Sequence, residues 1–315
     1  MTDSVQPVVR VARVKSLLSG VLLLDKPVGI SSQSAVSRVK RLLGVAKAGH
    51  TGTLDPLATG LLPICVGEAT KFSHVLLEAD KTYEASIRLG VTTTTGDREG
   101  ATTSTSPVAV PRNDIEEVLA RFIGEIDQVP PMFSAIKHQG RPLYKLAREG
   151  IVVARIARRV RIHLLDLVEI QGDVLRVKVV CGKGTYIRVL AEDIGRTLGC
   201  GASLDALRRT AVGTLRMQDA ICLEALEAES PGKRAERLFS VDAPVEVLPR
   251  IDMDPAQAQC LIHGRLVQHR AGDEVGLVRL YDASSGRFLG VGTRDASGTI
   301  TPRRLMVPLE KANIA

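Results

Sequence analysis

The 315-residue sequence contains no tryptophan, and aromatic residues make up only 3% of it. Apolar residues reach 44%, so the chain can build a core, but that core must rely on Leu, Val, Ile and Ala. The cysteines are scattered and form no C-x-x-C pair: Cys65, Cys181, Cys200, Cys222 and Cys260. This pattern indicates neither a zinc knuckle nor a disulfide framework, and it fits a reducing cytosol.

Long hydrophobic runs are also missing. The first apolar stretch is interrupted by Asp25 and Lys26, so it resembles neither a signal peptide nor a membrane span. We therefore expect a cytoplasmic protein without membrane contact. The sequence has no Walker A loop, no Rossmann glycine pattern, no G-x-S-x-G and no metal-binding histidine spacing. We expect no metal and no cofactor, so any chemistry must use ordinary side chains.

Positive charge is in excess. The formal net charge is +7 and the sequence pI is about 9.3, which favours a polyanionic partner such as nucleic acid. Between residues 141 and 161, cations outnumber the single acid Glu149: Arg141, Lys145, Arg148, Arg155, Arg158, Arg159 and Arg161. This cluster is either a solvated basic face or a surface that follows phosphates, and the second would make binding salt-dependent.

Hydrophobic periodicity predicts a mixed α+β protein with mostly antiparallel strands. Residues 20–29 read as a buried strand and turn, and a serine-capped helix follows and ends at Gly44. Residues 81–91 alternate like a half-buried strand, with Tyr83 on the apolar face. The segment 113–124 reads as a helix with an Asn113/Glu116 capping box.

The chain divides into three predicted regions. Residues 1–18 look like a basic leader, residues 19–248 form the main domain, and residues 249–315 form a small β domain. The boundary follows a proline-containing linker, and turn signals at Ser285-Gly286 and Ser297-Gly298 predict a β-meander beyond it.

The stretch "GHTGTLDPLATG" at residues 49–60 surrounds one acid, Asp55, with small residues and threonines. Asp followed by Pro is a common helix start, because Asp accepts unpaired N–H bonds and Pro lacks one. The local pattern therefore favours Asp55 as a helix cap, and catalysis is the alternative.

Two further side chains have open interpretations. Arg188 lies in the first turn of a helix predicted over residues 185–199, where a cation opposes the helix dipole. It pairs either with Glu192 on the surface or with an acid from another segment, whose pKa it would lower. Tyr83 is either a core residue or a ring that stacks on an extruded base.

Several ordered motifs bear a family resemblance: "GVLLLDKPVGISS", "AGHTGTLDPLATGLLPICVGEATKF", "DKTYEASIRLG", "PPMFSAIKHQGRPLYKLAREG", "CGKGTYIRVLAEDIGRTLGCGA", "LRRTAVG" and "TPRRLMV". Over nearly the whole chain they resemble the bacterial tRNA pseudouridine synthases of the TruB type. The resemblance implies a pseudouridine synthase fold with a central RNA-binding cleft and a C-terminal PUA-like RNA-binding domain. It also implies a tRNA T-stem-loop as partner, with the uridine at tRNA position 55 as target. We expect a monomer.

The resemblance also implies roles for particular residues. Asp55 resembles the catalytic aspartate, and His50 the histidine that holds flipped nucleotides. Tyr83 is similar to the tyrosine that stacks on the target base, and it is a candidate for the late proton transfer. Tyr186 is similar to the family's base-contacting tyrosine, and Arg188 to the arginine that pairs with the aspartate. Leu207 matches an apolar residue that packs the base pocket.

Three positions are less settled. Lys26 lies in a family motif with a structural or phosphate-contacting role. Thr94 stands where relatives often have an acid, and Phe133 stands where tyrosine is usual. These departures concern loop geometry rather than the implied catalytic set.

The implied reaction breaks the N1–C1′ bond, rotates the uracil and joins C5 to C1′. An ionised carboxylate serves it either as nucleophile at C1′ or as base at C2′ on a glycal route. A tRNA-binding chaperone without catalysis is the main alternative. A glycosidase is a more distant one, because no second carboxylate partner is apparent in the sequence.

Overall fold

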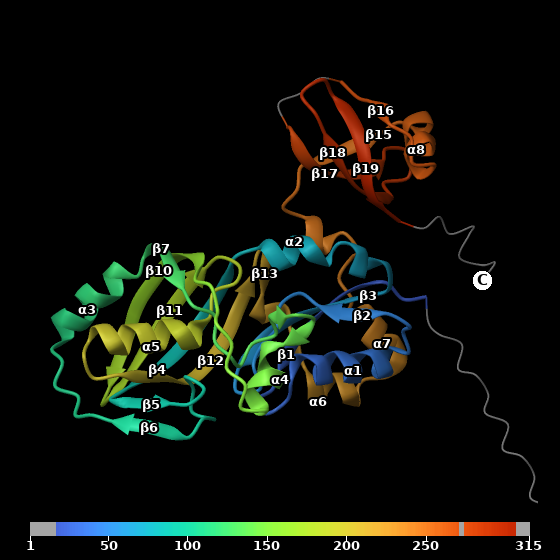
Figure 1. Cartoon of the computed structure of the whole chain (residues 1–315). Coiled ribbons are helices and arrows are strands. Elements are labelled where there is room, and N and C mark those ends of the chain that lie inside the picture. Colours follow the sequence, from blue (N-terminus) through green and yellow to red (C-terminus); the bar gives the residue numbers. More distant parts are fainter. Residues whose placement is uncertain (1–16, 271–273, 307–315) are drawn as a thin grey trace, which may run out of the picture.

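The computed structural model describes residues 17–270 and 274–306. The predicted leader at residues 1–18 therefore lies almost wholly outside the described residues. The main body is built on one large sheet, and a small β domain stands beside it (Figure 1). None of the helices in the described ranges is both long and apolar enough to cross a membrane.

The large sheet has ten strands. They are β1 (Gly20–Lys26), β2 (Ala48–His50), β3 (Thr59–Val66), β4 (Lys81–Leu89), β7 (Gly124–Gln128), β10 (Arg158–Gln171), β11 (Val174–Cys181), β12 (Ala202–Val212), β13 (Leu215–Arg216) and β14 (Ile221–Cys222). The order is β14-β1-β3-β12-β4-β11-β10-β7, with β2 beside β3 and β13 beside β12. Only β1–β14 and β3–β12 pair in parallel among these strands. The predicted mixed, mostly antiparallel class is confirmed.

Helices cover this sheet in two groups. They are α1 (Ser32–Leu43), α2 (Ser73–Glu78), α3 (Arg112–Arg121), α4 (Leu143–Arg148), α5 (Ile187–Thr197), α6 (Leu223–Ala228) and α7 (Pro231–Glu236). Helices α3 and α5 lie over the half that contains β4, β10 and β11, whereas α1, α6 and α7 flank the half with β1 to β3 (Figure 1).

Short elements complete the main body. The 3-10 turns are η1 (Gly67–Lys71), η2 (Met217–Asp219) and η3 (Ala243–Val245). Two small ribbons pair β5 (Val91–Thr93) with β6 (Thr102–Thr105) and β8 (Lys137–His138) with β9 (Arg141–Pro142).

Local sequence explains several element ends. Helix α1 begins after Ser31, whose side chain accepts the Ser34 backbone N–H, and it ends at Gly44 in the left-handed region with φ 66°. The predicted cap and stop are confirmed. The predicted Asn113/Glu116 capping box in α3 is wrong. That helix begins at Arg112, two residues before the start that a cap at Asn113 requires, and it has no side-chain cap. Glu116 instead accepts a hydrogen bond from Arg112 at 2.7 Å.

The small β domain contains β15 (Arg250–Met253), α8 (Pro255–Ile262), β16 (Val267–Gln268), β17 (Gly276–Asp282), β18 (Phe288–Arg294) and β19 (Thr299–Leu305). The predicted meander is confirmed as the antiparallel run β17-β18-β19. This domain contacts the main body through aromatic side chains, because Phe288 packs edge-on against Phe72 with 5.1 Å between ring centroids. The Tyr281 hydroxyl also bonds Asp242.

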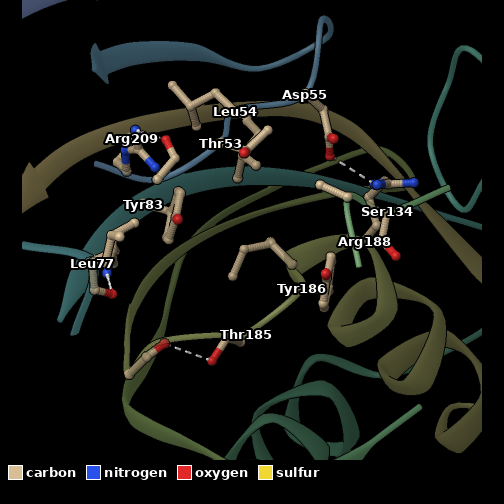
Figure 2. A pocket seen from close by; sticks show the side chains of 17 residues that line it. Thr53, Leu54, Asp55, Leu77, Tyr83, Ser134, Thr185, Tyr186, Arg188 and Arg209 are labelled. Atoms are coloured by element: carbon tan, nitrogen blue, oxygen red, sulfur yellow. Dashed lines mark hydrogen bonds and ion pairs between the residues drawn. The ribbon is translucent and has the colours of Figure 1, made fainter. Parts of the chain in front are cut away.

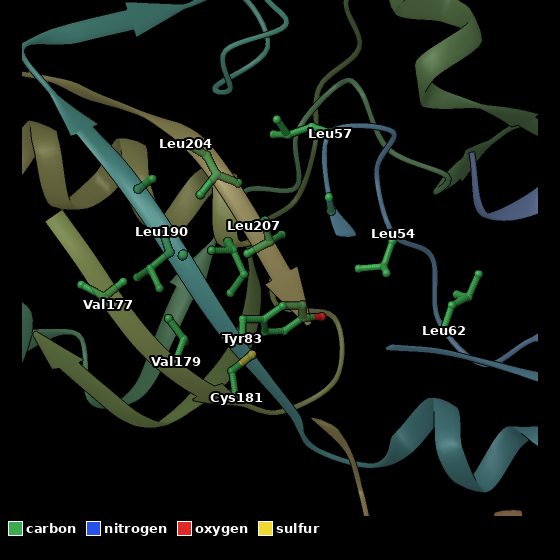
Figure 3. Close-up of a cluster of buried hydrophobic side chains, with 14 of the residues drawn as sticks. Leu54, Leu57, Leu62, Tyr83, Val177, Val179, Cys181, Leu190, Leu204 and Leu207 are labelled. Carbon is green, nitrogen blue, oxygen red and sulfur yellow. The ribbon is translucent and has the colours of Figure 1, made fainter. Parts of the chain in front are cut away.

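The main core is aliphatic, as the scarcity of aromatic residues predicts. Leu, Val and Ile side chains from β4, β11, β12 and α5 pack together in it, and Figure 3 shows Tyr83 at its edge beside Cys181 and Leu207. Tyr83 has 8% of its surface exposed. The alternation predicted for its strand is confirmed, since every second residue of β4 is buried.

Candidate active site

Asp55 lies in the connection between β2 and β3, and no helix follows it. Its carbonyl accepts the Ala58 backbone N–H at 3.0 Å to close a tight turn, and β3 starts at Thr59. The helix-cap interpretation of Asp55 is therefore wrong. The Asp-Pro pair favours a helix start locally, but the residues that follow it belong to a strand. Gly60 of β3 is aligned with Arg209 of β12, and this pairing across the sheet overrides the local preference for a helix.

Arg188 is the second residue of α5 and reaches Asp55 from the other half of the sheet. Its Nε donates to Asp55 Oδ2 at 2.9 Å, its Nη1 to the Thr95 carbonyl at 3.0 Å and its Nη2 to the Phe133 carbonyl at 2.8 Å. The side chain is 4% exposed, whereas that of Asp55 is 36% exposed. The alternative of a surface pair with Glu192 is wrong, and the pairing with a distant acid is confirmed (Figure 2).

Asp97 is a second carboxylate at this guanidinium, and the sequence analysis missed it. Its Oδ2 lies 3.5 Å from Arg188 Nε, and its side chain is 5% exposed. Its Oδ1 accepts from the Thr95 hydroxyl at 2.6 Å and from the Glu99 backbone N–H at 3.1 Å. Asp97 is thus a buried carboxylate that is held by neighbouring groups of its own loop and lies next to the Asp55–Arg188 pair. The signal that could have found it is the lone acid that ends the polar run "TTTTGD".

A cavity of about 270 Å³ opens beside this pair. Asp55 and Arg188 stand at one end of it, and Tyr83, Tyr186 and Leu207 contribute to its walls. In Figure 2 the Asp55 carboxylate points toward Arg188 and Ser134, and Tyr83 lies farther along the cavity. Ser134 and Arg209 also line it, and the sequence analysis had not marked either. The structure thus brings four of the five carried-over partners of Asp55 to one cavity.

His50 and Lys26 occupy other positions. His50 lines a neighbouring groove of about 700 Å³ that shares Asp55 and Arg188 with the cavity. Its Nδ1 accepts the Gly52 backbone N–H at 3.3 Å. Lys26 is fully buried, and its Nζ donates to the Pro27 and Ile30 carbonyls at 2.8 and 2.9 Å. This placement suits the structural alternative for Lys26 and leaves its ammonium group no surface for a phosphate.

Burial dominates the electrostatics of the site. It raises the pKa of Asp55 above the usual 3.8, and the charge and hydrogen bond of Arg188 oppose that rise. Arg188 does lower the pKa of Asp55, as expected. The prediction that the pKa of this acid lies below its usual value is wrong, because burial raises it by more than Arg188 lowers it. Burial also raises the pKa of Tyr83 and of Tyr186, so both stay neutral phenols. It lowers the pKa of His50, with help from the charge of Arg209.

The basic segment at residues 141–161 is partly neutralised. Arg141 pairs with Glu149 at 2.5 Å, and Arg159 lies 3.7 Å from both Glu125 and Asp127. In the ranges that the structure describes, no three His, Cys, Asp or Glu side chains are grouped to hold a metal ion. The absence of a metal from the reaction stays a prediction.

The mixed sheet with an Asp–Arg pair beside a cavity agrees with the pseudouridine synthase class that the sequence motifs predict, and comparisons with known proteins show that class. Residues 40–187 match the family described as TruB family pseudouridylate synthase (N terminal domain). Residues 188–249 match the tRNA pseudouridylate synthase B C-terminal domain, and residues 249–306 match Pseudouridine synthase II TruB, C-terminal. The chain belongs to the TruB family of pseudouridine synthases.

Individual relatives support this assignment. The chain is 53% identical over 292 residues to the tRNA pseudouridine synthase B of Aromatoleum aromaticum, covering 93% of this chain and 94% of the relative. It is 52% identical to the protein of the same name from Dechloromonas aromatica, covering 92% and 96%. Among solved structures, a Cbf5-Nop10-Gar1 complex contains a chain with a TM-score of 0.72 and 27% identity, covering 92% of this chain and 86% of that one.

Proposed function

We propose that the protein converts the T-loop uridine at tRNA position 55 to pseudouridine, with Asp55 as the catalytic residue. The observation that carries this proposal is the 2.9 Å bond between Asp55 and Arg188 at the end of the cavity. The carboxylate is partly exposed there while its partner is buried. A reacting sugar can therefore reach the acid without displacing the arginine.

The cavity walls suit a base that has left its stack. Tyr83 and Tyr186 offer rings against which a uracil can stack, and Leu207 adds an apolar surface. Such walls exclude water and so suppress hydrolysis of the sugar after the N1–C1′ bond breaks. The detached uracil rotates in the cavity and its C5 attacks C1′. On the nucleophile route this breaks the bond between C1′ and the Asp55 carboxylate, and on the glycal route Asp55 returns its proton to C2′. In both routes the proton on C5 then leaves as C5–C1′ becomes the new glycosidic bond, and N1 gains a proton. Asp55 serves either as nucleophile at C1′ or as base at C2′, and both routes need it ionised.

Binding of the T-stem-loop rests on the groove beside the cavity and on the basic surface. His50 lines that groove next to Asp55, which suits contacts to nucleotides adjacent to the target. The C-terminal β domain is the proposed PUA-like RNA-binding unit, with its boundary near residue 248. We propose that the enzyme acts in the cytoplasm as a monomer, although the solved relative named above is a complex of Cbf5 with Nop10 and Gar1.

The test is tritium release from 5-tritiated uridine in a folded T-stem-loop, without added metal or nucleotide. Wild type should release tritium, and Asp55→Ala should release none while still binding the RNA. No release by wild type from a verified folded RNA overturns the proposal. Full release by Asp55→Ala overturns the role of Asp55. Salt-sensitive RNA binding and refolding without any release would support the chaperone alternative instead.

A further inference from the structure

Ser32 holds the backbone next to Asp55. It is the first residue of α1, and 2% of its surface is exposed. Its hydroxyl donates to the Leu54 carbonyl at 2.9 Å and accepts the Leu54 N–H at 2.8 Å. One side chain thus satisfies both backbone groups of the residue directly before Asp55. On the other side of Asp55, the Pro56 carbonyl accepts the Gly29 N–H at 2.8 Å.

Gln128 makes the same kind of contact on the Arg188 side. It ends β7, and 1% of its surface is exposed. Its Oε1 accepts the Tyr186 N–H at 3.0 Å, and its Nε2 donates to the Tyr186 carbonyl at 3.3 Å. Tyr186 is the cap residue of α5 and lies two residues before Arg188.

These contacts replace bonds that regular structure would otherwise supply. Leu54 lies in an irregular loop, where its backbone N–H and carbonyl lack strand or helix partners. Tyr186 caps α5, so its N–H has no helix partner, whereas its carbonyl already accepts the Leu190 N–H at 3.0 Å. The Ser32 hydroxyl therefore satisfies both backbone groups of Leu54, while the Gln128 amide satisfies the Tyr186 N–H and adds a second bond to its carbonyl.

Two bonds from one side chain also fix the position of the backbone at Leu54 and at Tyr186, because a shift of either residue would lengthen both of its bonds. Neither Ser32 nor Gln128 lines the 270 Å³ cavity. Ser32 does contribute to the lining of the neighbouring 700 Å³ groove, but it is 2% exposed and its hydroxyl is used by the two bonds to Leu54.

We infer that Ser32 and Gln128 are positioning residues that set the Asp55–Arg188 geometry for the chemical step. Ser32 fixes the loop that carries Asp55, and Gln128 fixes the start of the helix that carries Arg188. The inference rests on the proposed function. Because both side chains are buried, their removal should slow the reaction of bound RNA rather than weaken RNA binding.

The experiment compares Ser32→Ala and Gln128→Met with wild type in single-turnover tritium release. We expect the rate at saturating enzyme to fall by about tenfold to a hundredfold, because a displacement of 1 Å costs on that order. The Kd for the T-stem-loop should stay within about twofold, since every lost contact is intramolecular.

The pH profile separates positioning from simple stability. The charged groups that act on Asp55 are Arg188, Asp97 and Lys26, and Arg188 is the main one that keeps its pKa from rising further. A looser pair weakens that effect, so the acid limb of the rate profile should move to higher pH in both variants. A loss of stability alone leaves the limb in place for the folded fraction.

Two matched controls lie on α1. Ser37→Ala removes a hydroxyl that bonds only the Gln33 carbonyl of the same helix, at 2.9 Å, and should keep the wild-type rate. Val39→Ala removes a fully buried core side chain and should lower the urea midpoint without moving the acid limb. If Ser32→Ala does not fold, Gln128→Met carries the test, since it removes both contacts to Tyr186 without adding a charge.

Unchanged rates and acid limbs in the folded variants would overturn the inference. So would a fall in rate that merely matches that of Val39→Ala. An inactive wild type would instead overturn the proposed function, so the two failures are distinguishable.

Discussion

Arg188→Met tests how the site keeps two acids close together. Methionine preserves the apolar length of the side chain but removes the donors that bond Asp55, Thr95 and Phe133. Removing one partner of a buried ion pair costs about 3–5 kcal/mol. Water reaches Asp55, which is 36% exposed, but not Asp97, which is 5% exposed. Solvent screening at Asp55 reduces the cost, so we expect a loss of unfolding free energy of about 3 kcal/mol at neutral pH.

The same substitution should change the pH dependence of the reaction. Burial raises the pKa of Asp55, and Arg188 is the strongest influence against that rise. Activity needs the ionised acid, so it is lost as pH falls through this raised pKa. Without Arg188 the pKa of Asp55 rises further, and the acid limb must move to higher pH. The rate at the plateau should fall by about a hundredfold or more, because the carboxylate also loses its fixed position.

Single-turnover tritium release from pH 5 to 9, with urea unfolding of the same samples, measures both effects. Arg188→Lys is the matched control. It keeps the charge, but its single ammonium nitrogen cannot replace the planar fork whose Nε, Nη1 and Nη2 reach Asp55, Thr95 and Phe133. We expect it to shift the acid limb less than Arg188→Met while remaining well below the wild-type rate. A wild-type limb and rate in Arg188→Met would refute the electrostatic reasoning. A wild-type rate in Arg188→Lys would refute the role of the fixed geometry.

Further substitutions test other contacts. Gly60→Ala should lower the free energy of unfolding by at least about 2 kcal/mol in urea unfolding. The reason is that Gly60 has φ +100° and a new Cβ would lie 2.3 Å from the Arg209 carbonyl oxygen. Wild-type stability of this variant would contradict the prediction. Phe288→Ala should cost about 2–3 kcal/mol through lost packing on Phe72 and give the β domain a separate calorimetric transition; a single unchanged transition would refute it. Burial lowers the pKa of Lys26 from 10.5 to about 8. Between these values the unfolded chain binds more protons, so stability rises with pH. Lys26→Met should therefore show a smaller rise between pH 8 and 10.5 in urea titrations, and an equal rise would contradict the assignment.

Elements with strong local signals were predictable from the sequence. Helix α1 carries its own cap at Ser31 and its own stop at Gly44, and β4 alternates between buried and solvated residues along its whole length. The capping box at Asn113 failed because that pattern fits more than one register. Helix α3 adopts the register in which Arg112 and Glu116 form a pair one turn apart.

The site itself was less predictable from residue patterns. Asp55 and Arg188 are 133 positions apart, so no local rule could choose between Glu192 and a distant acid as the arginine's partner. The family resemblance supplied that choice. Asp97 was missed because a polar loop gives no periodic signal, and its burial arises only once α5 packs beside it. Ser32 and Gln128 were missed for the same reason, since their bonds join segments that are distant in the sequence.

The position of the site follows from how the two halves of the sheet are joined. Strands β3 and β12 connect these halves in parallel, with Thr59 aligned to Arg208 and Gly60 to Arg209. The Asp55 turn ends where this pairing begins, and a side chain at Gly60 would collide with the backbone of β12. A helix started by Asp55 would remove β3 from this pairing and separate the halves. The chain therefore has to leave Asp55 through a turn, and that turn presents the carboxylate to an arginine carried by the opposite half.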